Sequence, residues 1–155
     1  PSIWPRLDVP LFSLTQICPY HQGLLITYWD TSQTNNNHVN VHPGEGLILP
    51  IDAHQEPLTW FGFLWRPDVQ SSDAPFGLEP TDRLLLNNAG FVDSTGGQPP
   101  VSTFDDRQSY WNPDLPWLGV KNPHTGTIIE VKAVSAQGSF MEVEVRPAKA
   151  KSNQD

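Results

Sequence analysis

The sequence has 155 residues, which is enough for one domain with a substantial buried core. Its formal net charge of -8 at pH 7 disfavours nucleic acid or an anionic membrane as a partner, because both recruit basic surfaces. The single cysteine, Cys18, excludes an internal disulfide and a cysteine-based zinc ribbon, and no apolar run approaches the roughly 20 residues of a membrane-spanning helix.

The proline-rich start and the polar end set the expected domain limits. Pro10 interrupts the apolar residues 9–14 and would confine a strand there to the edge of a sheet. Residues 1–18 are therefore expected to be an N-terminal edge segment or a junction, in a chain that begins at Pro1 as a piece of a longer protein. Residues 19–146 are predicted to form a single β-sandwich domain, followed by a polar tail at 147–155.

Two short apolar segments, residues 24–29 and 47–51, are predicted to be buried strands. Both are rich in β-branched and aromatic residues and are bounded by turn formers. Each is followed by an aspartate, Asp30 or Asp52. The polar connection between them is long for a compact domain, and such a loop is usually functional or held in place by something.

Hard oxygen donors lie along this connection and predict a possible calcium site. Calcium takes about six to eight oxygens from carboxylates, amides and backbone carbonyls. The spacing matches no EF-hand loop, and Asp and Asn also cap turns, so a metal site and simple Asx turns both remain open. The four candidate ligands are Asp30, Asn36, Glu45 and Asp52. A second acidic cluster, open to the same two interpretations, consists of Asp105, Asp106 and Asp114.

The middle of the chain is dominated by aromatic residues and turns. Trp60 and Trp65, within the aromatic residues 58–65, are candidates for an exposed interface with another domain. Tryptophan more often packs in a core, and a carbohydrate platform is a third possibility. Residues 83–86 are predicted to be a short strand, and residues 87–100 have turn chemistry almost throughout.

The clearest structural prediction is a C-terminal hairpin. In residues 127–133 and 139–146, apolar and charged residues alternate, which predicts strands with one buried and one solvated face. The link between them contains Gly138, as a turn with positive φ requires. Sixteen prolines and eleven glycines, without a long helical period, indicate an all-β fold. We expect an antiparallel β-sandwich with long ordered loops and this hairpin.

No catalytic set can be assembled from these residues. His38 and His42 have the four-residue spacing of a helical zinc pair, but Pro43 and β-branched neighbours disfavour a helix there. The sequence contains no HExxH motif, and no serine has a nucleophile-elbow context. The chain on its own is therefore not expected to be an enzyme.

Two ordered blocks of residues resemble the C-terminal region of immune inhibitor A-like metallopeptidases. The first block includes residues 19–30, Asn36 and Asn37, residues 42–46 and residues 51–54, and the second lies within residues 104–129. The resemblance implies a parent that is a secreted bacterial zinc endopeptidase, with an HExxH catalytic domain followed by β-rich accessory modules, some of which bind calcium. This chain resembles the last of these modules, the all-β VEG domain.

The resemblance therefore implies a non-catalytic accessory β domain of an extracellular zinc metalloendopeptidase. Such a domain would contact the catalytic and neighbouring β domains of its parent, stabilising the protease or assisting contact with substrate. Calcium is the cofactor expected in this domain, and zinc is expected only in the catalytic domain of the parent. The alternative is an independent module that binds carbohydrate or another cell-surface polymer through exposed aromatic rings.

Overall fold

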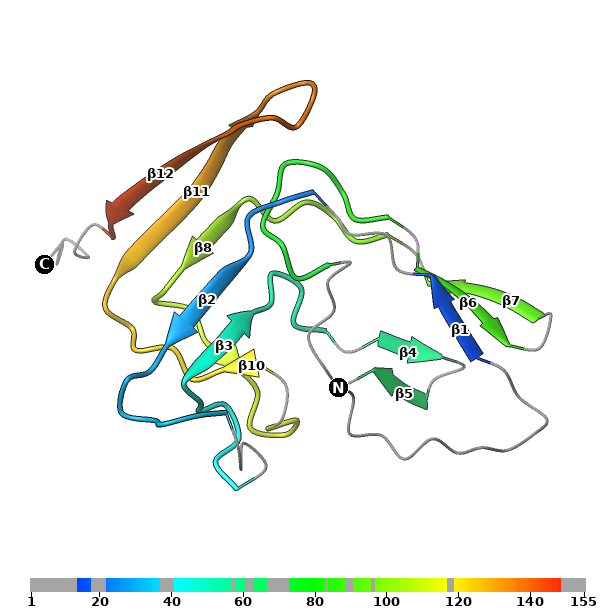
Figure 1. The fold of residues 1–155 in the computed structure, drawn as a ribbon, viewed down its shortest axis with the longest axis horizontal. Coiled ribbons are helices and arrows are strands. Elements are labelled where there is room, and N and C mark those ends of the chain that lie inside the picture. Colours follow the sequence, from blue (N-terminus) through cyan, green and yellow to red (C-terminus); the bar gives the residue numbers. More distant parts are fainter. Residues whose placement is uncertain are drawn as a thin grey trace, which may run out of the picture.

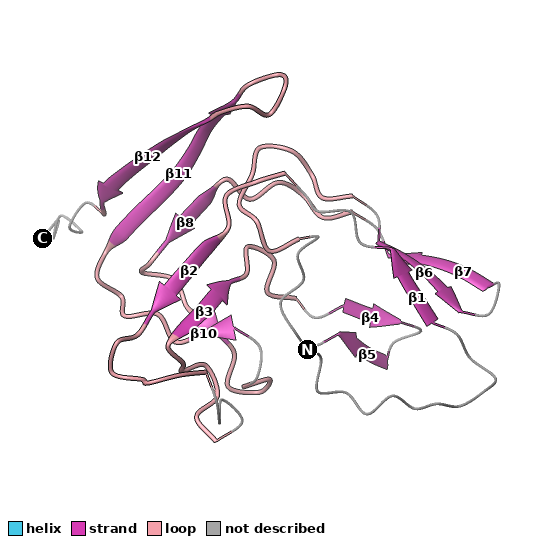
Figure 2. Cartoon of the chain, viewed as in Figure 1, coloured by secondary structure: helices cyan, strands magenta, loops and turns pink. Residues whose placement is uncertain are grey.

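The computed structural model describes residues 14–17, 22–36, 41–56, 58–60, 63–66, 73–82, 84–88, 91–95, 97–116 and 119–148. Within these ranges the chain forms strands and loops and no helix (Figure 2), so none of the described residues supply an apolar helix long enough to cross a membrane. Every pairing between the described strands is antiparallel. The predicted all-β class is confirmed, and the arrangement as a sandwich stays a prediction.

One group of strands lies to the right in Figure 1 and includes a three-stranded sheet of order β1-β6-β7. Its strands are β1 (Leu14–Ile17), β6 (Leu84–Asn88) and β7 (Phe91–Thr95), and the nearby two-stranded sheet pairs β4 (Leu58–Trp60) with β5 (Phe63–Arg66). Among the described strands, β1 lies at the edge of its sheet. The prediction of turns throughout residues 87–100 is wrong for residues 87–88 and 91–95, which belong to β6 and β7 and pair from Asn88 opposite Phe91 to Leu84 opposite Thr95.

The other group contains the remaining strands (Figure 1). They are β2 (Ile26–Trp29), β3 (Ile48–Ile51), β8 (Thr103–Asp105), β9 (Tyr110–Trp111), β10 (Gly119–Val120), β11 (Thr127–Val134) and β12 (Met141–Pro147). Two pairs, β2-β3 and β9-β10, accompany a sheet of order β12-β11-β8. Residues 24–29 and 47–51 thus contain strands, as their composition predicts, and the structure pairs these two strands with each other.

The prediction that these two strands are buried is only partly correct. Along β2, Ile26 and Tyr28 are half-buried and pack against the core, whereas Thr27 and Trp29 are exposed. Trp29 is 64% exposed. The reason is the two-residue period of a strand, which turns alternate side chains to opposite faces, and only one face of β2 is covered within the described residues.

The core forms where side chains from distant segments meet. Phe76 is 1% exposed, and its ring lies edge-on to Phe104 at 5.9 Å and to Tyr110 at 6.3 Å between centroids. Such edge-to-face pairs are a favourable geometry for aromatic rings. Backbone hydrogen bonds in both directions between Leu24 and Phe76 fix the central ring beside β2. The buried members of this core are Ile51, Phe76, Phe104, Tyr110 and Val120.

The predicted C-terminal hairpin is confirmed. β11 pairs with β12 from Thr127 opposite Pro147 to Val134 opposite Met141, with a register shift between Val131 and Ala133. Gly138 has a φ of 64°, a conformation that most side chains avoid. β12 extends one residue into the segment expected to be a polar tail, and residues 149–155 of that segment lie outside the described ranges.

Candidate functional site

Two of the predicted calcium ligands hold turns at the two ends of the same loop. Asp30 Oδ1 accepts hydrogen bonds from the backbone N–H of Ser32 at 2.9 Å and from its hydroxyl at 2.6 Å. These hydrogen bonds lower the pKa of the exposed Asp30 carboxyl. The Asn36 amide meets the backbone of Ile48, donating to its carbonyl at 2.8 Å and accepting from its N–H at 2.9 Å. Asn36 thereby mimics one more pair of a β-ladder.

Glu45 takes part in docking the turn at residues 42–46 onto β9 and β10. Its Oε1 lies 2.8 Å from Lys121 Nζ, and this ammonium sits 4.6 Å from the centre of the Trp111 ring. The backbone N–H of Lys121 donates to the carbonyl of Gly44 at 2.9 Å. Gly44 has a φ of 82°, and a side chain there would clash with the Trp111 indole, so glycine is required at this contact.

Each of the four predicted ligands contacts a different group of the protein in the structure. Among the described residues, no group of three or more His, Cys, Asp or Glu side chains is arranged to hold a metal ion. Residues 37–40, including His38, lie outside the described ranges, and His42 is exposed. A calcium site built from Asp30, Asn36, Glu45 and Asp52 therefore stays a prediction.

Replacing Asn36 with alanine is expected to lower the free energy of unfolding by about 1–2 kcal/mol, because both hydrogen bonds to Ile48 are lost. Asn36→Asp, which keeps one acceptor but places a carboxylate oxygen near the Ile48 carbonyl, should also destabilise. Urea unfolding measures both effects. Thr34→Ala, a change at an exposed residue of the same loop, should stay within about 0.5 kcal/mol of the unaltered chain. Equal stability of the Asn36→Ala and unaltered chains would contradict this role.

Asp52, the fourth candidate, belongs to a buried polar group that we call the His54 cluster, made of Asp52, His54 and Asp73. Asp52 Oδ1 accepts a hydrogen bond from the backbone N–H of His54 at 2.9 Å. The two ring nitrogens of His54 lie 2.5 Å from the carbonyl oxygen of Asp73 and 2.8 Å from that of Pro99. Asp73 Oδ2 accepts from Gln98 Nε2 at 3.0 Å. The cluster thus connects three segments that are distant in sequence.

The environment of the His54 cluster disfavours its negative charges. Burial raises the pKa of Asp52 to about 7, and repulsion from Asp73 adds to the rise while the hydrogen bond from His54 opposes it. Burial also raises the pKa of Asp73. Sequence analysis selected neither His54 nor Asp73. The sequence signal that could have identified Asp73 is its position directly before the small and apolar residues 74–76. These three residues are buried in the structure.

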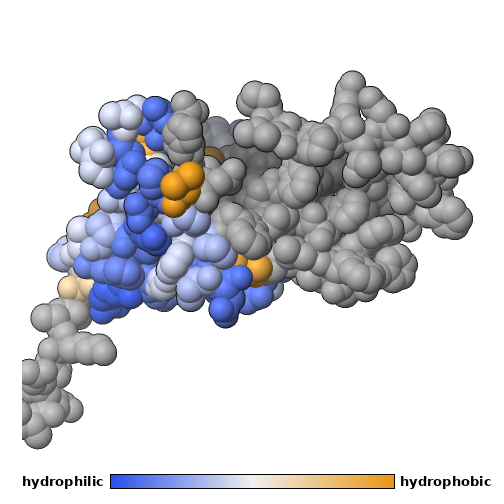
Figure 3. Space-filling model, turned by 90° about the horizontal axis from the view of Figure 1, so that it is seen from below, coloured by the Kyte–Doolittle hydropathy of each residue, from blue (hydrophilic) through white to orange (hydrophobic). Residues whose placement is uncertain are grey.

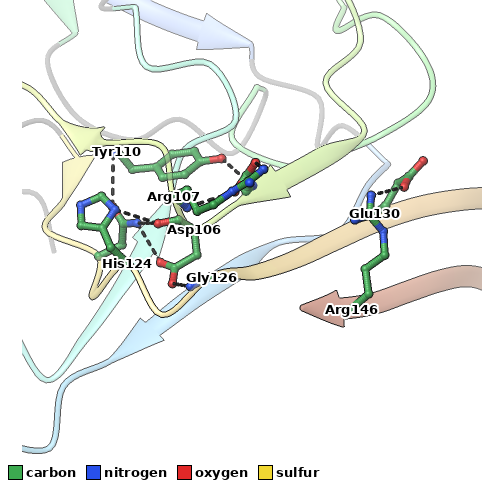
Figure 4. A network of polar contacts seen from close by, with 9 residues as sticks. Asp106, Arg107, Tyr110, His124, Gly126, Glu130 and Arg146 are labelled. Atoms are coloured by element: carbon green, nitrogen blue, oxygen red, sulfur yellow. Dashed lines mark hydrogen bonds and ion pairs between the residues drawn. The ribbon is translucent and has the colours of Figure 1, made fainter. Parts of the chain in front are cut away.

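Asp106 is the centre of a second buried network, shown in Figure 4. Its Oδ1 accepts from Asn122 Nδ2 at 2.8 Å, and its Oδ2 accepts from the backbone N–H of Thr125, from the Thr125 hydroxyl at 2.7 Å and from the N–H of Gly126 at 3.2 Å. Asn122 also accepts from the N–H of Tyr110. One carboxylate therefore fixes the loop at residues 121–126 between β10 and β11.

The predicted second acidic cluster separates into different contacts. The Asp105 carboxylate forms a two-pronged ion pair with Arg107, at 2.9 Å and 2.6 Å, and the hydrogen bonds of this pair lower the pKa of Asp105 to about 2. Burial raises the pKa of Asp106, but the hydrogen bonds from Asn122, Thr125 and Gly126 outweigh burial and the net shift is downward. Asp114 is exposed, and its backbone N–H donates to Asn112 Oδ1 at 2.9 Å.

A cavity of about 180 Å³ opens beside the Asp106 network. The side chains of Tyr28, Phe104 and Ile129 line it together with Asp106 and Asn122. Both carboxylate oxygens of Asp106 are already bound to the loop. A ligand in the cavity would have to compete with these hydrogen bonds, so the geometry indicates that Asp106 is an anchor of the fold.

The predicted interface at Trp60 and Trp65 involves side chains that the structure does not describe. Trp60 is in β4 and Trp65 in β5, and the side chains of both strands lie outside what the structure describes. Of the tryptophans with described side chains, Trp29 is exposed and Trp111 is half-buried beneath Lys121. The described part of the face shown in Figure 3 is mostly hydrophilic, with small separated apolar spots. The carbohydrate-binding alternative stays a prediction.

The edge strand β12 presents two unlike faces. Val143 and Val145 pair with Val131 and Ile129, so their side chains share the face of β11 that packs inward. Val131 is 1% exposed, but Val143 is 36% and Val145 is 66% exposed. The inward-facing surface of the sheet thus extends onto β12, and on β12 the described residues leave much of it uncovered.

The opposite face of this hairpin carries an ion-pair ladder. Glu130 lies directly opposite Glu144, and Lys132 Nζ lies 3.0 Å from the first carboxylate and 3.2 Å from the second. Arg146 adds weaker contacts to both at 3.6 Å and 3.7 Å. The two cations offset the repulsion of the facing carboxylates, and charges of this kind also discourage unwanted pairing at a sheet edge.

Comparison with known proteins identifies the same family that the sequence resembles. The family model described as the VEG domain of immune inhibitor A-like metallopeptidases matches residues 10–143. Pre-pro-metalloprotease PrtV of Vibrio cholerae serotype O1 is 31% identical over 128 residues, which are 81% of this chain and 14% of that protein. Immune inhibitor A of Bacillus thuringiensis subsp. alesti is 30% identical over 121 residues, which are 72% of this chain and 17% of that protein. The chain thus spans a small part of the length of these metallopeptidases.

Proposed function

This chain belongs to the VEG-domain family of immune inhibitor A-like metallopeptidases, and on that premise we propose that it is a non-catalytic accessory β domain of a secreted zinc metalloendopeptidase. Its role is to pack against another domain of the same protease and stabilise it. The small share of each relative that the chain covers supports an accessory role, as does the absence of an HExxH motif from its sequence. An extracellular location follows from the same proposal.

The exposed apolar face of β12 is the observation that supports a packing role. Val145 and Val143 continue an inward-facing surface, and Phe140, the residue before β12 begins, is 69% exposed. Adjacent exposed apolar side chains on one element are a feature of surfaces that contact a partner. The ion-pair ladder occupies the other face, so β12 has one apolar side to bury and one charged side to leave in water.

We expect Val145→Lys to weaken this packing without unfolding the chain. The side chain is largely exposed, so urea unfolding of the isolated chain should change by less than about 0.5 kcal/mol. In a protease that carries this chain with its neighbouring domains, a buried lysine would lack a partner, and limited proteolysis at the domain junctions should become several-fold faster.

Val41→Lys is the matched control, because Val41 is 72% exposed and lies in the loop between β2 and β3. It should leave the proteolysis rate unchanged. Unaltered protection in the Val145→Lys protease would show that β12 does not contact a neighbouring domain, and the proposed packing surface would be wrong.

A further inference from the structure

We propose that the cavity beside the Asp106 network receives a lysine side chain from the domain that packs against β12. The methylene groups of this lysine would lie along the apolar wall of the cavity, and its ammonium group would face the Asp106 carboxylate. The inference rests on the packing role proposed for β12, and it adds a named chemistry to that contact.

The cavity has the size and lining of a site for one long side chain. Its volume of about 180 Å³ lies below the roughly 300–1,000 Å³ of pockets that hold drug-sized ligands. Its lining is mainly apolar, and Asp106 alone carries a charge among the described residues of that lining. The apolar wall includes Ile26, Tyr28, Ile51, Phe104 and Ile129. Lysine suits such a wall, because it buries its methylene groups against apolar surfaces.

Asp106 carries a buried negative charge that has no ion pair within the described part of the chain. The residue is 2% exposed, and its carboxylate accepts hydrogen bonds from neutral donors of Asn122, Thr125 and Gly126. His124 contacts the backbone carbonyl of Asp106 and not its carboxylate. Burial raises the pKa of Asp106, but the hydrogen bonds outweigh burial, so the carboxylate is charged at neutral pH. Buried charges are usually paired, and the cavity is therefore complementary to a cation.

An ammonium group can approach without displacing the hydrogen bonds that anchor the loop. Asp106 Oδ1 accepts one hydrogen bond, from Asn122, and a carboxylate oxygen has two lone pairs. The rings of Tyr28 and Phe104 in the lining also attract cations. Lysine fits better than arginine, because the guanidinium group brings five N–H donors and needs more acceptors than this cavity has free. Asp106 can thus hold the loop and attract a lysine together.

The position of the cavity identifies the source of the lysine. Ile129, which lines the cavity, lies directly opposite Val145 of β12, and opposite side chains in a sheet share one face. Val145 is 66% exposed, and neighbouring strands are only about 4.8 Å apart. Figure 1 shows β12, β11 and β8 in succession, with β2 beside β8. A domain that covers Val145 therefore also lies next to the cavity.

The chemistry of the cavity is tested on the full chain with n-butylammonium chloride, which has the stem and the charge of a lysine side chain. Methyl NMR titration should give saturable shifts at Ile26, Ile51 and Ile129. Ile128 is the internal control, because it lies on the other face of β11 and should not shift. The neutral match 1-butanol should bind about tenfold more weakly, and butanoate should cause no shifts at these methyl groups.

Asp106→Asn should remove the preference for the ammonium over the alcohol, because it removes the charge and keeps the shape of the side chain. If this variant does not fold, about 0.5 M sodium chloride gives the same comparison on the unaltered chain, since salt should weaken binding of the ammonium and not of the alcohol. Absence of shifts with n-butylammonium, or equal affinities for the two compounds, overturns the proposal.

The source is tested in a protease that carries this chain with its neighbouring domains. When lysines are acetylated with acetic anhydride and analysed by mass spectrometry, one lysine outside this chain should react several-fold more slowly than exposed lysines. Asp106→Asn should accelerate its reaction. Glu130→Gln is the matched control, because it removes a carboxylate from the opposite face of the hairpin, and it should leave the lysine protected.

These outcomes separate the inference from the packing role of β12. If Val145→Lys exposes the domain junctions but no lysine depends on Asp106, the packing role stands and this inference is wrong. Protection of an arginine from phenylglyoxal in place of a lysine would also overturn it. Unaltered junctions in the Val145→Lys protease would overturn the packing role and with it the source of the lysine, while the NMR titration would still report the chemistry of the cavity.

Discussion

Replacing Asp106 with alanine is expected to lower the free energy of unfolding by about 3 kcal/mol, because several donors around a buried carboxylate lose their acceptor together. The Thr125 hydroxyl and the N–H groups of Thr125 and Gly126 all point to Asp106 Oδ2, and Asn122 points to Oδ1. Toward residues 105–108, the loop at residues 121–126 would keep only its contacts from Asn122 and His124 to backbone carbonyls, such as that of Asp106. Urea unfolding followed by far-UV circular dichroism measures the change.

Asp114→Ala is the control for this prediction. Its side chain is exposed, and the change should cost less than about 0.5 kcal/mol. A loss of similar size in both variants would show that the Asp106 network does not anchor the loop.

The same network predicts a dependence on pH. The net shift lowers the pKa of Asp106 in the folded chain, so the unfolded chain binds this proton more readily. Its stabilising contribution is therefore fully present above the ordinary carboxyl pKa of about 4 and is lost as the pH falls through the lower folded value. Between about pH 6 and about pH 3, the free energy of unfolding should therefore fall less for the Asp106→Asn variant than for the unaltered chain. The same urea experiment at these two pH values measures both changes.

Replacing Phe76 with alanine is expected to cost about 3–5 kcal/mol, the range for removing a large ring from a core. Phe76 is 1% exposed and contacts both Phe104 and Tyr110 edge-on. The cavity would lie where β2, β8 and β9 converge, so these segments cannot close it without losing their own pairing. Thermal unfolding should show a large drop in Tm.

Leu78→Ala tests whether position within the core decides the effect. Leu78 is two residues further along the chain but 39% exposed, so its loss should cost about 1 kcal/mol or less. Phe76→Leu should fall between the two, because leucine refills part of the space. A small effect of Phe76→Ala would mean that the aromatic cluster is not the centre of the fold.

Local patterns in the sequence were enough to predict several strands. Alternation in residues 127–133 and 139–146 identified β11 and β12, since a two-residue period and a glycine turn are both local features. The apolar composition of residues 24–29 and 47–51 identified β2 and β3. It overestimated their burial, because composition does not reveal whether one or both faces of a strand are covered.

The polar sites depend on contacts that the sequence does not encode locally. His54 meets Asp73 and Pro99, and Asp106 meets Asn122 and Thr125, only after distant segments have packed together. The candidate ligands Asp30 and Asn36 illustrate a second limit, because a carboxylate or amide oxygen suited to a cation is equally suited to a backbone N–H. The residue types were visible in the sequence, and their partners were not.

The position of β11 in the chain has a consequence for synthesis. Ile129 of β11 lies opposite Phe104 of β8 and packs against the central aromatic cluster, and Val131 is buried beside it. On the ribosome, residues 14–120 emerge before β11 does. Phe104 and its neighbours must therefore wait for residues 127–134 before their sheet is complete, and apolar surface stays exposed during this interval. Translation that pauses before β11 is released should leave a nascent chain that chaperones recognise.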